Sequence, residues 1–121
     1  MVRVPGFLLK KLYVKKSLKN TEDGFEFELN NVLADATIVE PLTLIVDKEE
    51  IPQENVKIIF EGKELRATDI NTSNPIPFKV KTKITVKVYG KKLEPGKHSI
   101  ELKTKAKEYG ELKFTFKDEV F

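Results

Sequence analysis

Apolar and polar residues alternate with a period of two along much of the chain. The clearest cases are GFEFELN, residues 24–30, and KVKTKITVKVY, residues 79–89. In the first, Phe25, Phe27 and Leu29 share one face, while glutamates occupy the other. Such alternation is typical of β-strands that bury one face and expose the other. We therefore expect both segments to be strands that cover a core.

Shorter segments of the same kind account for most of the remaining chain. Turn signals separate them at intervals of about eight to twelve residues, and none of them has a useful helical periodicity. The pattern predicts an all-β fold, an immunoglobulin/fibronectin-like antiparallel β-sandwich of about seven or eight strands. Besides the two strands above, we expect extended segments over residues 8–18, 38–46, 56–60, 64–67, 98–106 and 112–116.

Prolines refine this prediction. Pro41 sits inside the segment 38–46, so that strand lies at an edge or begins after the proline. Pro52 is expected to start a short helical turn, where its missing N–H costs nothing. In the proline-containing stretch 71–78, Ile76 and Phe78 are expected to close one end of the core.

The stretch LEPGKHSIEL, residues 93–102, predicts the passage between the two sheets. Pro95 suits the first corner of a turn, and Gly96 can adopt the positive φ that follows it. Immunoglobulin-like sandwiches often cross between sheets at such a turn and place a ring residue just after it. Here His98 would hold that place.

Composition limits the class of protein. A chain of 121 residues with 40% hydrophobic residues is expected to be a single β-sandwich domain over 1–121, with residues 1–6 as a flexible N-terminal arm. Charged residues make up 34%, yet the net charge is only +3, which argues only weakly for nucleic acid. The Lys- and Glu-rich composition is typical of thermophile proteins. Without cysteine, a signal peptide or a long apolar run, we expect a cytoplasmic protein with no membrane segment.

Candidate chemistry is sparse. His98 is the only histidine, and Ser99 beside it points to the opposite face of the same strand, so the two cannot form a base–nucleophile pair. A structural His98 is therefore favoured over a general base or metal ligand. Glu26 and Glu28 would stand roughly 7 Å apart on one strand face, but a solvated face explains them better than a glycosidase pair or a cation site. We expect no catalytic, cofactor-binding or metal site, no cofactor, and no enzyme activity of the chain alone.

Lysines gather on two predicted strands. If these strands formed a hairpin, Lys81 and Lys83 would face like charges, which would favour an anionic partner. If the Pro-Gly turn is a sheet crossover, as we favour, the lysines belong to different sheets and protect strand edges from aggregation. Nucleic acid is then an unlikely partner. The members are Lys79, Lys81, Lys83 and Lys87 on one strand and Lys103, Lys105 and Lys107 on the next.

Both ends of the chain carry apolar residues. Phe7, Leu8 and Leu9 lie near the start, and Val120 and Phe121 close the sequence. They could complete the core or form an interface with a protein partner or a second copy of the chain.

Four motifs together resemble the small β-subunit domain of C-glycoside deglycosidases. They are a Val-Asp-x-Glu turn at 46–49, with Lys48 where that family tends to have Gly, a Pro-containing turn at 51–56, a Gly-Lys-Glu hairpin at 62–65 and a Pro-Gly-x-His strand at 95–100. The resemblance covers roughly residues 23–116. It implies a β-sandwich subunit that packs on a larger, metal-dependent barrel subunit, which carries the catalytic residues. No catalytic residue is carried over to this chain.

These observations together predict a non-catalytic accessory or assembly subunit that partners a larger, sugar-processing enzyme subunit of the C-glycoside deglycosidase kind. The alternative is a stand-alone binding module for carbohydrate or an anionic partner. A sugar binder would normally present stacked aromatic side chains, and this chain has no Trp.

Overall fold

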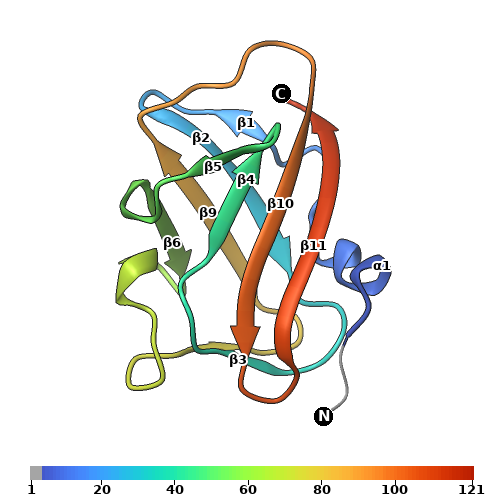
Figure 1. The fold of residues 1–121 in the computed structure, drawn as a ribbon, viewed down its shortest axis with the longest axis vertical. Coiled ribbons are helices and arrows are strands. Elements are labelled where there is room, and N and C mark those ends of the chain that lie inside the picture. Colours follow the sequence, from blue (N-terminus) through green and yellow to red (C-terminus); the bar gives the residue numbers. More distant parts are fainter. Residues whose placement is uncertain (1–3) are drawn as a thin grey trace.

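The computed structural model describes residues 4–121 as two antiparallel β-sheets that face each other (Figure 1). The all-β sandwich predicted from the sequence is confirmed, although short pairing segments raise the number of strands within residues 4–121 to eleven. The first sheet has the order β1 (Lys19–Asn20), β2 (Gly24–Asn30), β9 (Lys83–Tyr89), β6 (Val56–Phe60) and β7 (Lys63–Arg66). The second contains β5 (Glu49–Ile51), β4 (Thr43–Val46), β10 (Lys97–Ala106), β3 (Ala36–Ile38) and β8 (Ile76–Phe78), with β11 (Gly110–Glu119) paired to β10.

The N-terminal segment is helical, which corrects the strand predicted over residues 8–18. A helical turn, α1 (Gly6–Leu9), continues into a 3-10 turn, η1 (Lys10–Leu12). Leu9 and Leu12 are both buried, and a spacing of three places them on one side of a helix but on opposite faces of a strand. Of the expected flexible arm over residues 1–6, residues 1–3 lie outside the described residues, and Gly6 already belongs to α1.

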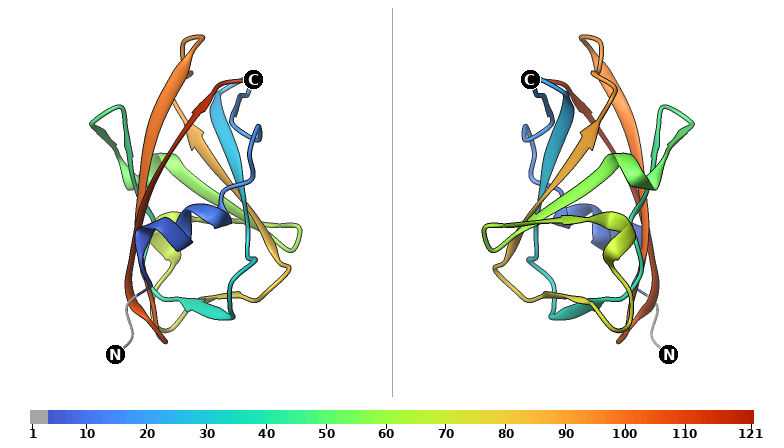
Figure 2. Two further views of the ribbon diagram at one scale, coloured as in Figure 1. Left: turned by 90° about the vertical axis from the view of Figure 1, so that its right-hand side faces the viewer. Right: turned by 90° about the vertical axis from the view of Figure 1, so that its left-hand side faces the viewer.

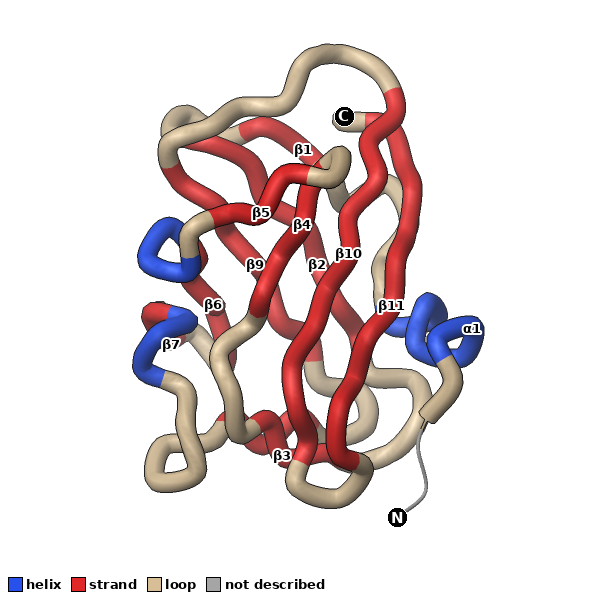
Figure 3. Tube along the Cα trace, viewed as in Figure 1, coloured by secondary structure: helices blue, strands red, loops and turns tan. Residues whose placement is uncertain are grey.

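The N-terminal segment covers one open side of the sandwich. Figure 2 shows α1 crossing from β11 of the second sheet towards β2 of the first. Beyond η1, Tyr13 forms an isolated bridge with Leu29 of β2. One short segment therefore contacts both sheets. Figure 3 shows that the helical turns are small pieces at the sides of a molecule built from strands.

Two other predicted strands are shorter than expected. The segment 38–46 is divided into β3 and β4, and β4 begins after Pro41, one of the two outcomes that the proline allowed. The strand predicted over 79–89 begins only at Lys83, because Lys81 adopts a positive φ of 71° and its N–H donates to the carbonyl of Asn31. Val80 is consequently 41% exposed instead of buried.

The Pro-Gly turn is a sheet crossover, as predicted. β9 belongs to the first sheet and β10 to the second, and Gly96 has a φ of +117°. The 3-10 turn η2 (Gln53–Asn55), with Pro52 as its N-cap, and the buried side chains of Ile76 and Phe78 also agree with the sequence. The strand lysines are therefore divided between two sheets.

The buried side chains form one cluster between the sheets. Phe27 of β2 meets Phe116 of β11 edge to face, with ring centroids 5.2 Å apart. Each fully buried side chain of this size contributes about 1.5–3 kcal/mol relative to an exposed one. Among residues 4–121, no helix is long and apolar enough to cross a membrane.

Candidate functional site

An apolar hollow of about 340 Å³ lies beside α1. Its walls come from segments far apart in the sequence: the N-terminal helix, the loop that follows β2, and the ends of β8 and β11. Apolar side chains dominate the lining, and Asn31 is its main polar residue. The lining comprises Val4, Leu8, Leu9, Leu12, Asn31, Val32, Leu33, Ala34, Ala36, Phe78, Tyr109 and Leu112.

Exposed large hydrophobic side chains occur in the lining of this hollow and in the segments that form it or are tied to them. Val32, which lines it, is 53% exposed, and Phe7, adjacent to the lining residue Leu8, is 70% exposed. Val80 lies on a segment tied to the same loop, because its N–H donates to Asp35 Oδ1 over 2.9 Å. Contiguous exposed apolar surface is a general characteristic of sites at which proteins contact other molecules. The sequence left a place in the core and an interface both open for Phe7–Leu9; Leu9 is buried and Phe7 is exposed, and the sequence did not single out Val32.

Asn31 fixes the loop on one side of the hollow. Its side-chain amide donates to the carbonyls of Ala34 and Phe78, each over 2.8 Å, and its Oδ1 accepts from the Leu33 N–H over 3.0 Å. Because Asn31 is only 2% exposed, these bonds satisfy a buried polar group that would otherwise be costly. The sequence offered only one signal for this role, a polar residue at the end of an alternating strand.

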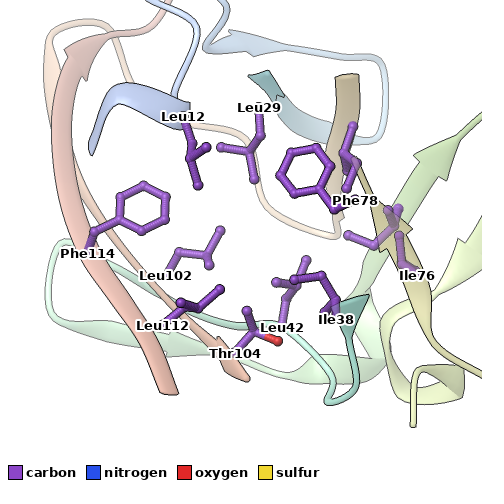
Figure 4. A pocket seen from close by; sticks show the side chains of 12 residues that line it. Leu12, Leu29, Ile38, Leu42, Ile76, Phe78, Leu102, Thr104, Leu112 and Phe114 are labelled. Atoms are coloured by element: carbon purple, nitrogen blue, oxygen red, sulfur yellow. The ribbon is translucent and has the colours of Figure 1, made fainter. Parts of the chain in front are cut away.

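A second, closed cavity lies inside the core between the two sheets (Figure 4). Its volume is about 30 Å³, far below the roughly 300 Å³ of small-molecule pockets. The polar side chain at its wall, Thr104, already donates its hydroxyl to the Glu40 carbonyl over 2.9 Å. This cavity is a gap in side-chain packing and does not have the size of a ligand site.

His98 joins β10 to two loops. Its Nδ1 lies 2.6 Å from Asp47 Oδ2, and its Nε2 lies 2.6 Å from the Glu94 carbonyl oxygen. Both neighbours are acceptors, so only the doubly protonated ring can donate to both. The hydrogen bond to Asp47, followed by that to Glu94, raises the pKa of His98 above 6.5, although burial opposes the shift. Both ring nitrogens are thus used in holding loops together, as a structural histidine would be.

The acidic and basic strand residues lie apart from the hollow. Glu26 forms an ion pair with Lys19 of the neighbouring strand over 3.9 Å, and Glu28 points from the same face of β2. Lys83 and Lys87 belong to the first sheet, whereas Lys103 and Lys105 belong to the second. The structure therefore does not bring the two predicted groups of lysines together. Among residues 4–121, no group of three or more His, Asp or Glu side chains could hold a metal ion.

The fold and the hollow define an antiparallel β-sandwich domain with an apolar surface site. The chain belongs to the family described as hydroxymethylglutaryl-CoA reductase, N-terminal domain, whose model matches residues 8–121. No curated protein matches the chain.

The resemblance to the small subunit of C-glycoside deglycosidases is therefore wrong. It was carried by turns such as 46–49 and by the strand 95–100, which are motifs of strand ends and crossovers. Any antiparallel sandwich needs such turns, so they indicate the fold without distinguishing one family from another.

Proposed function

We propose that this chain is a non-catalytic accessory domain that docks through the apolar hollow onto the catalytic part of a hydroxymethylglutaryl-CoA reductase. The catalytic part could be carried on the same polypeptide or on a separate one. The family description supports this choice of partner, because it assigns the domain to such a reductase. A cytoplasmic location belongs to the proposal, since a chain without cysteine gains nothing from an oxidising compartment.

The hollow beside α1 is the observation that carries the proposal. Its lining is mainly apolar, Val32 within it is 53% exposed, and Phe7, next in sequence to the lining residue Leu8, is 70% exposed. Burying such side chains against a partner contributes about 25 cal/mol per Å² of apolar surface removed from water. The fully buried core of a protein–protein interface is enriched in apolar side chains, whereas a sugar-binding module typically presents stacked aromatic rings on a concave face.

The test is complex formation between purified proteins. The full chain and the catalytic part of the reductase from the same organism are mixed as separate polypeptides, and the mass of the product is measured by light scattering after gel filtration. We expect a complex of fixed stoichiometry, with turnover of hydroxymethylglutaryl-CoA only in samples that contain the catalytic part.

Two matched variants locate the interface. Val32→Glu places a charge on the hollow, and we expect it to weaken the complex at least about tenfold, since a charge buried without a partner is costly. Phe121→Glu makes the same change in charge at a residue that is 58% exposed and lies at the other end of the molecule (Figure 1), and it should leave the complex intact. Absence of a complex, or turnover by this chain alone, would overturn the proposal.

The sequence also left open a stand-alone binding module for carbohydrate or an anionic partner. No observation on the hollow favours carbohydrate, because its lining is mainly aliphatic. An anionic partner would bind a basic surface, and such a surface lies elsewhere on the molecule.

A further inference from the structure

The outer edge of β11 has no neighbouring strand. β11 pairs with β10 along one side over its whole length, from Gly110 to Glu119. On its other side lie α1 and η1, which do not continue the sheet (Figure 1). An edge strand of this kind can pair with another extended chain unless something covers it.

The hydrogen-bonding pattern shows which residues of β11 face this free edge. The Asp47 N–H donates to the Ser99 carbonyl. The backbone N–H and carbonyl groups of odd-numbered residues of β10 therefore point towards β4, and those of even-numbered residues point towards β11. Ile100 lies opposite Phe116, so the backbone groups of even-numbered residues of β11 form the hydrogen bonds to β10. The backbone groups of the odd-numbered residues of β11 therefore point away from the sheet.

Thr115 and Lys117 form an open window in this edge. No hydrogen bond from residues 4–121 reaches the backbone N–H or carbonyl of either residue. The window is closed at one end by Gly6, where an added Cβ would lie 3.3 Å from the Lys113 carbonyl oxygen. At the other end, the Lys16 N–H donates to Asp118 Oδ2 over 2.9 Å. From residue 113 to 118 the strand spans roughly 17 Å, enough for about five extended residues.

The window opens into a basic hollow of about 960 Å³ between β11 and the N-terminal segment. Its lining contains five lysines and one carboxylate, that of Asp118. This carboxylate already accepts hydrogen bonds from the Tyr13 hydroxyl and the Lys16 N–H. None of the five forms an ion pair with a carboxylate in residues 4–121. The five are Lys10, Lys11, Lys15, Lys16 and Lys117.

We propose that this hollow binds an extended acidic peptide segment, which adds a strand to the second sheet at Thr115–Lys117. The free backbone groups supply the ladder hydrogen bonds of strand addition, and the unpaired lysines supply charge complementarity. Neither feature alone selects this occupant. A free polyanion would use the lysines without the backbone, whereas pairing of β11 with a second copy would use the backbone and bring Lys117 close to like charges. The acidic strand satisfies both features at once.

The first experiment uses a fluorescent seven-residue peptide in which Glu alternates with Val and Thr. Binding to the full chain is measured by fluorescence anisotropy at low and high salt. A matched peptide carries N-methyl groups on alternate residues, which removes ladder donors and keeps the charge. We expect binding of the first peptide that weakens with salt, and at least about tenfold weaker binding of the methylated one.

Backbone amide exchange locates the contact without any variant. In the free protein the amides of Thr115 and Lys117 should exchange quickly, while that of Phe116, bonded to β10, exchanges slowly. The peptide should slow the exchange of Thr115 and Lys117 and leave that of Phe116 unchanged. The same protection pattern without peptide, rising with protein concentration, would instead identify a second copy as the occupant and overturn the proposal.

Charge variants complete the test. Lys15→Glu with Lys117→Glu should weaken peptide binding at least about tenfold, and Lys79→Glu with Lys83→Glu, an equal change in net charge outside the hollow, should not. Equal binding of the methylated and unmethylated peptides would show electrostatic attraction alone and overturn strand addition. Failure of the acidic peptide to bind at low salt would also overturn the proposal.

Discussion

The hydroxyl of Tyr13 donates a hydrogen bond to Asp118 Oδ2 over 2.7 Å and so joins two residues that are 105 positions apart in the sequence. The Tyr13 ring stacks on Phe116, with centroids 3.8 Å apart and planes inclined by 12°. Burial and the Asp118 hydrogen bond raise the pKa of Tyr13 well above its ordinary value, so the hydroxyl stays a donor. This pair attaches the N-terminal segment to the edge strand β11, and both of its residues line the basic hollow.

Tyr13→Phe removes this hydrogen bond and keeps the stacked ring. We expect a loss of about 1–2 kcal/mol in the free energy of unfolding, measured by urea denaturation, since hydrogen bonds to charged groups lie at the upper end of the usual range. Tyr109→Phe is the matched control, because its hydroxyl lies 3.4 Å from the Asp35 carbonyl oxygen and makes at most a weak bond. Equal losses in the two variants would show that the hydrogen bond to Asp118 contributes no more to the free energy of unfolding than the weak contact of Tyr109.

His98 and Asp47 should make stability depend on pH in opposite directions. The raised pKa of His98 means that its contribution is complete below about pH 6.5 and is lost as the pH rises through the folded-state pKa. The hydrogen bonds from His98 and the Ser99 N–H lower the pKa of Asp47, so its contribution is present above about pH 3.8 and is lost as the pH falls through the folded-state value. The pair should therefore stabilise the fold most between these limits.

Thermal melting of the wild-type chain and of His98→Gln between pH 4 and pH 9 checks this expectation. The difference between the two melting temperatures should be largest near pH 5–6 and shrink towards alkaline pH. A difference that does not change with pH would mean that His98 acts only through packing. The variant should still fold, because His98 lies at a loop contact and outside the central cluster of buried side chains.

Periodicity predicted those parts of the molecule in which local pattern and tertiary packing agree. GFEFELN forms β2 because each apolar side chain on one of its faces packs into the core. The crossover at Pro95–Gly96 was predictable because the turn needs a positive φ, which the local residues themselves supply at Gly96. The segment around Leu9 and Leu12 was misread because an apolar pair at a spacing of three has no long periodic context, and its helical form depends on contact with β11.

Both surface sites were largely beyond the reach of the sequence for the same reason. Val32 belongs to the apolar hollow only because the loop after β2 folds towards α1, and the five lysines of the basic hollow converge only because α1 lies beside β11. Each site depends on contacts between distant segments, and no spacing within one segment encodes them.

Asn31→Ala tests the loop that borders the apolar hollow. The change removes three hydrogen bonds and leaves the Phe78 carbonyl, bonded in a buried position, without this donor. We expect a loss of about 2–4 kcal/mol in the free energy of unfolding. Asn74→Ala is a suitable control, since its side chain makes one exposed hydrogen bond, to the Asp69 carbonyl, and should cost less than about 1 kcal/mol. A small effect at Asn31 would mean that the loop, and the hollow with it, can rearrange freely.

Gly24→Ala should be the most damaging small substitution in the first sheet. Gly24 begins β2 opposite Tyr89, and an added Cβ would lie 1.9 Å from the Val88 carbonyl oxygen, a backbone atom that no side-chain rotation can move. β2 and β9 would have to separate where they start to pair, so we expect a loss of about 3 kcal/mol or more in the free energy of unfolding. Gly62→Ala is the control: its φ of +77° costs about 1 kcal/mol for a residue with a side chain, but no atom lies within 4 Å of the added Cβ. Urea denaturation of both variants separates steric exclusion from backbone strain, and equal losses would contradict the close approach of these two strands.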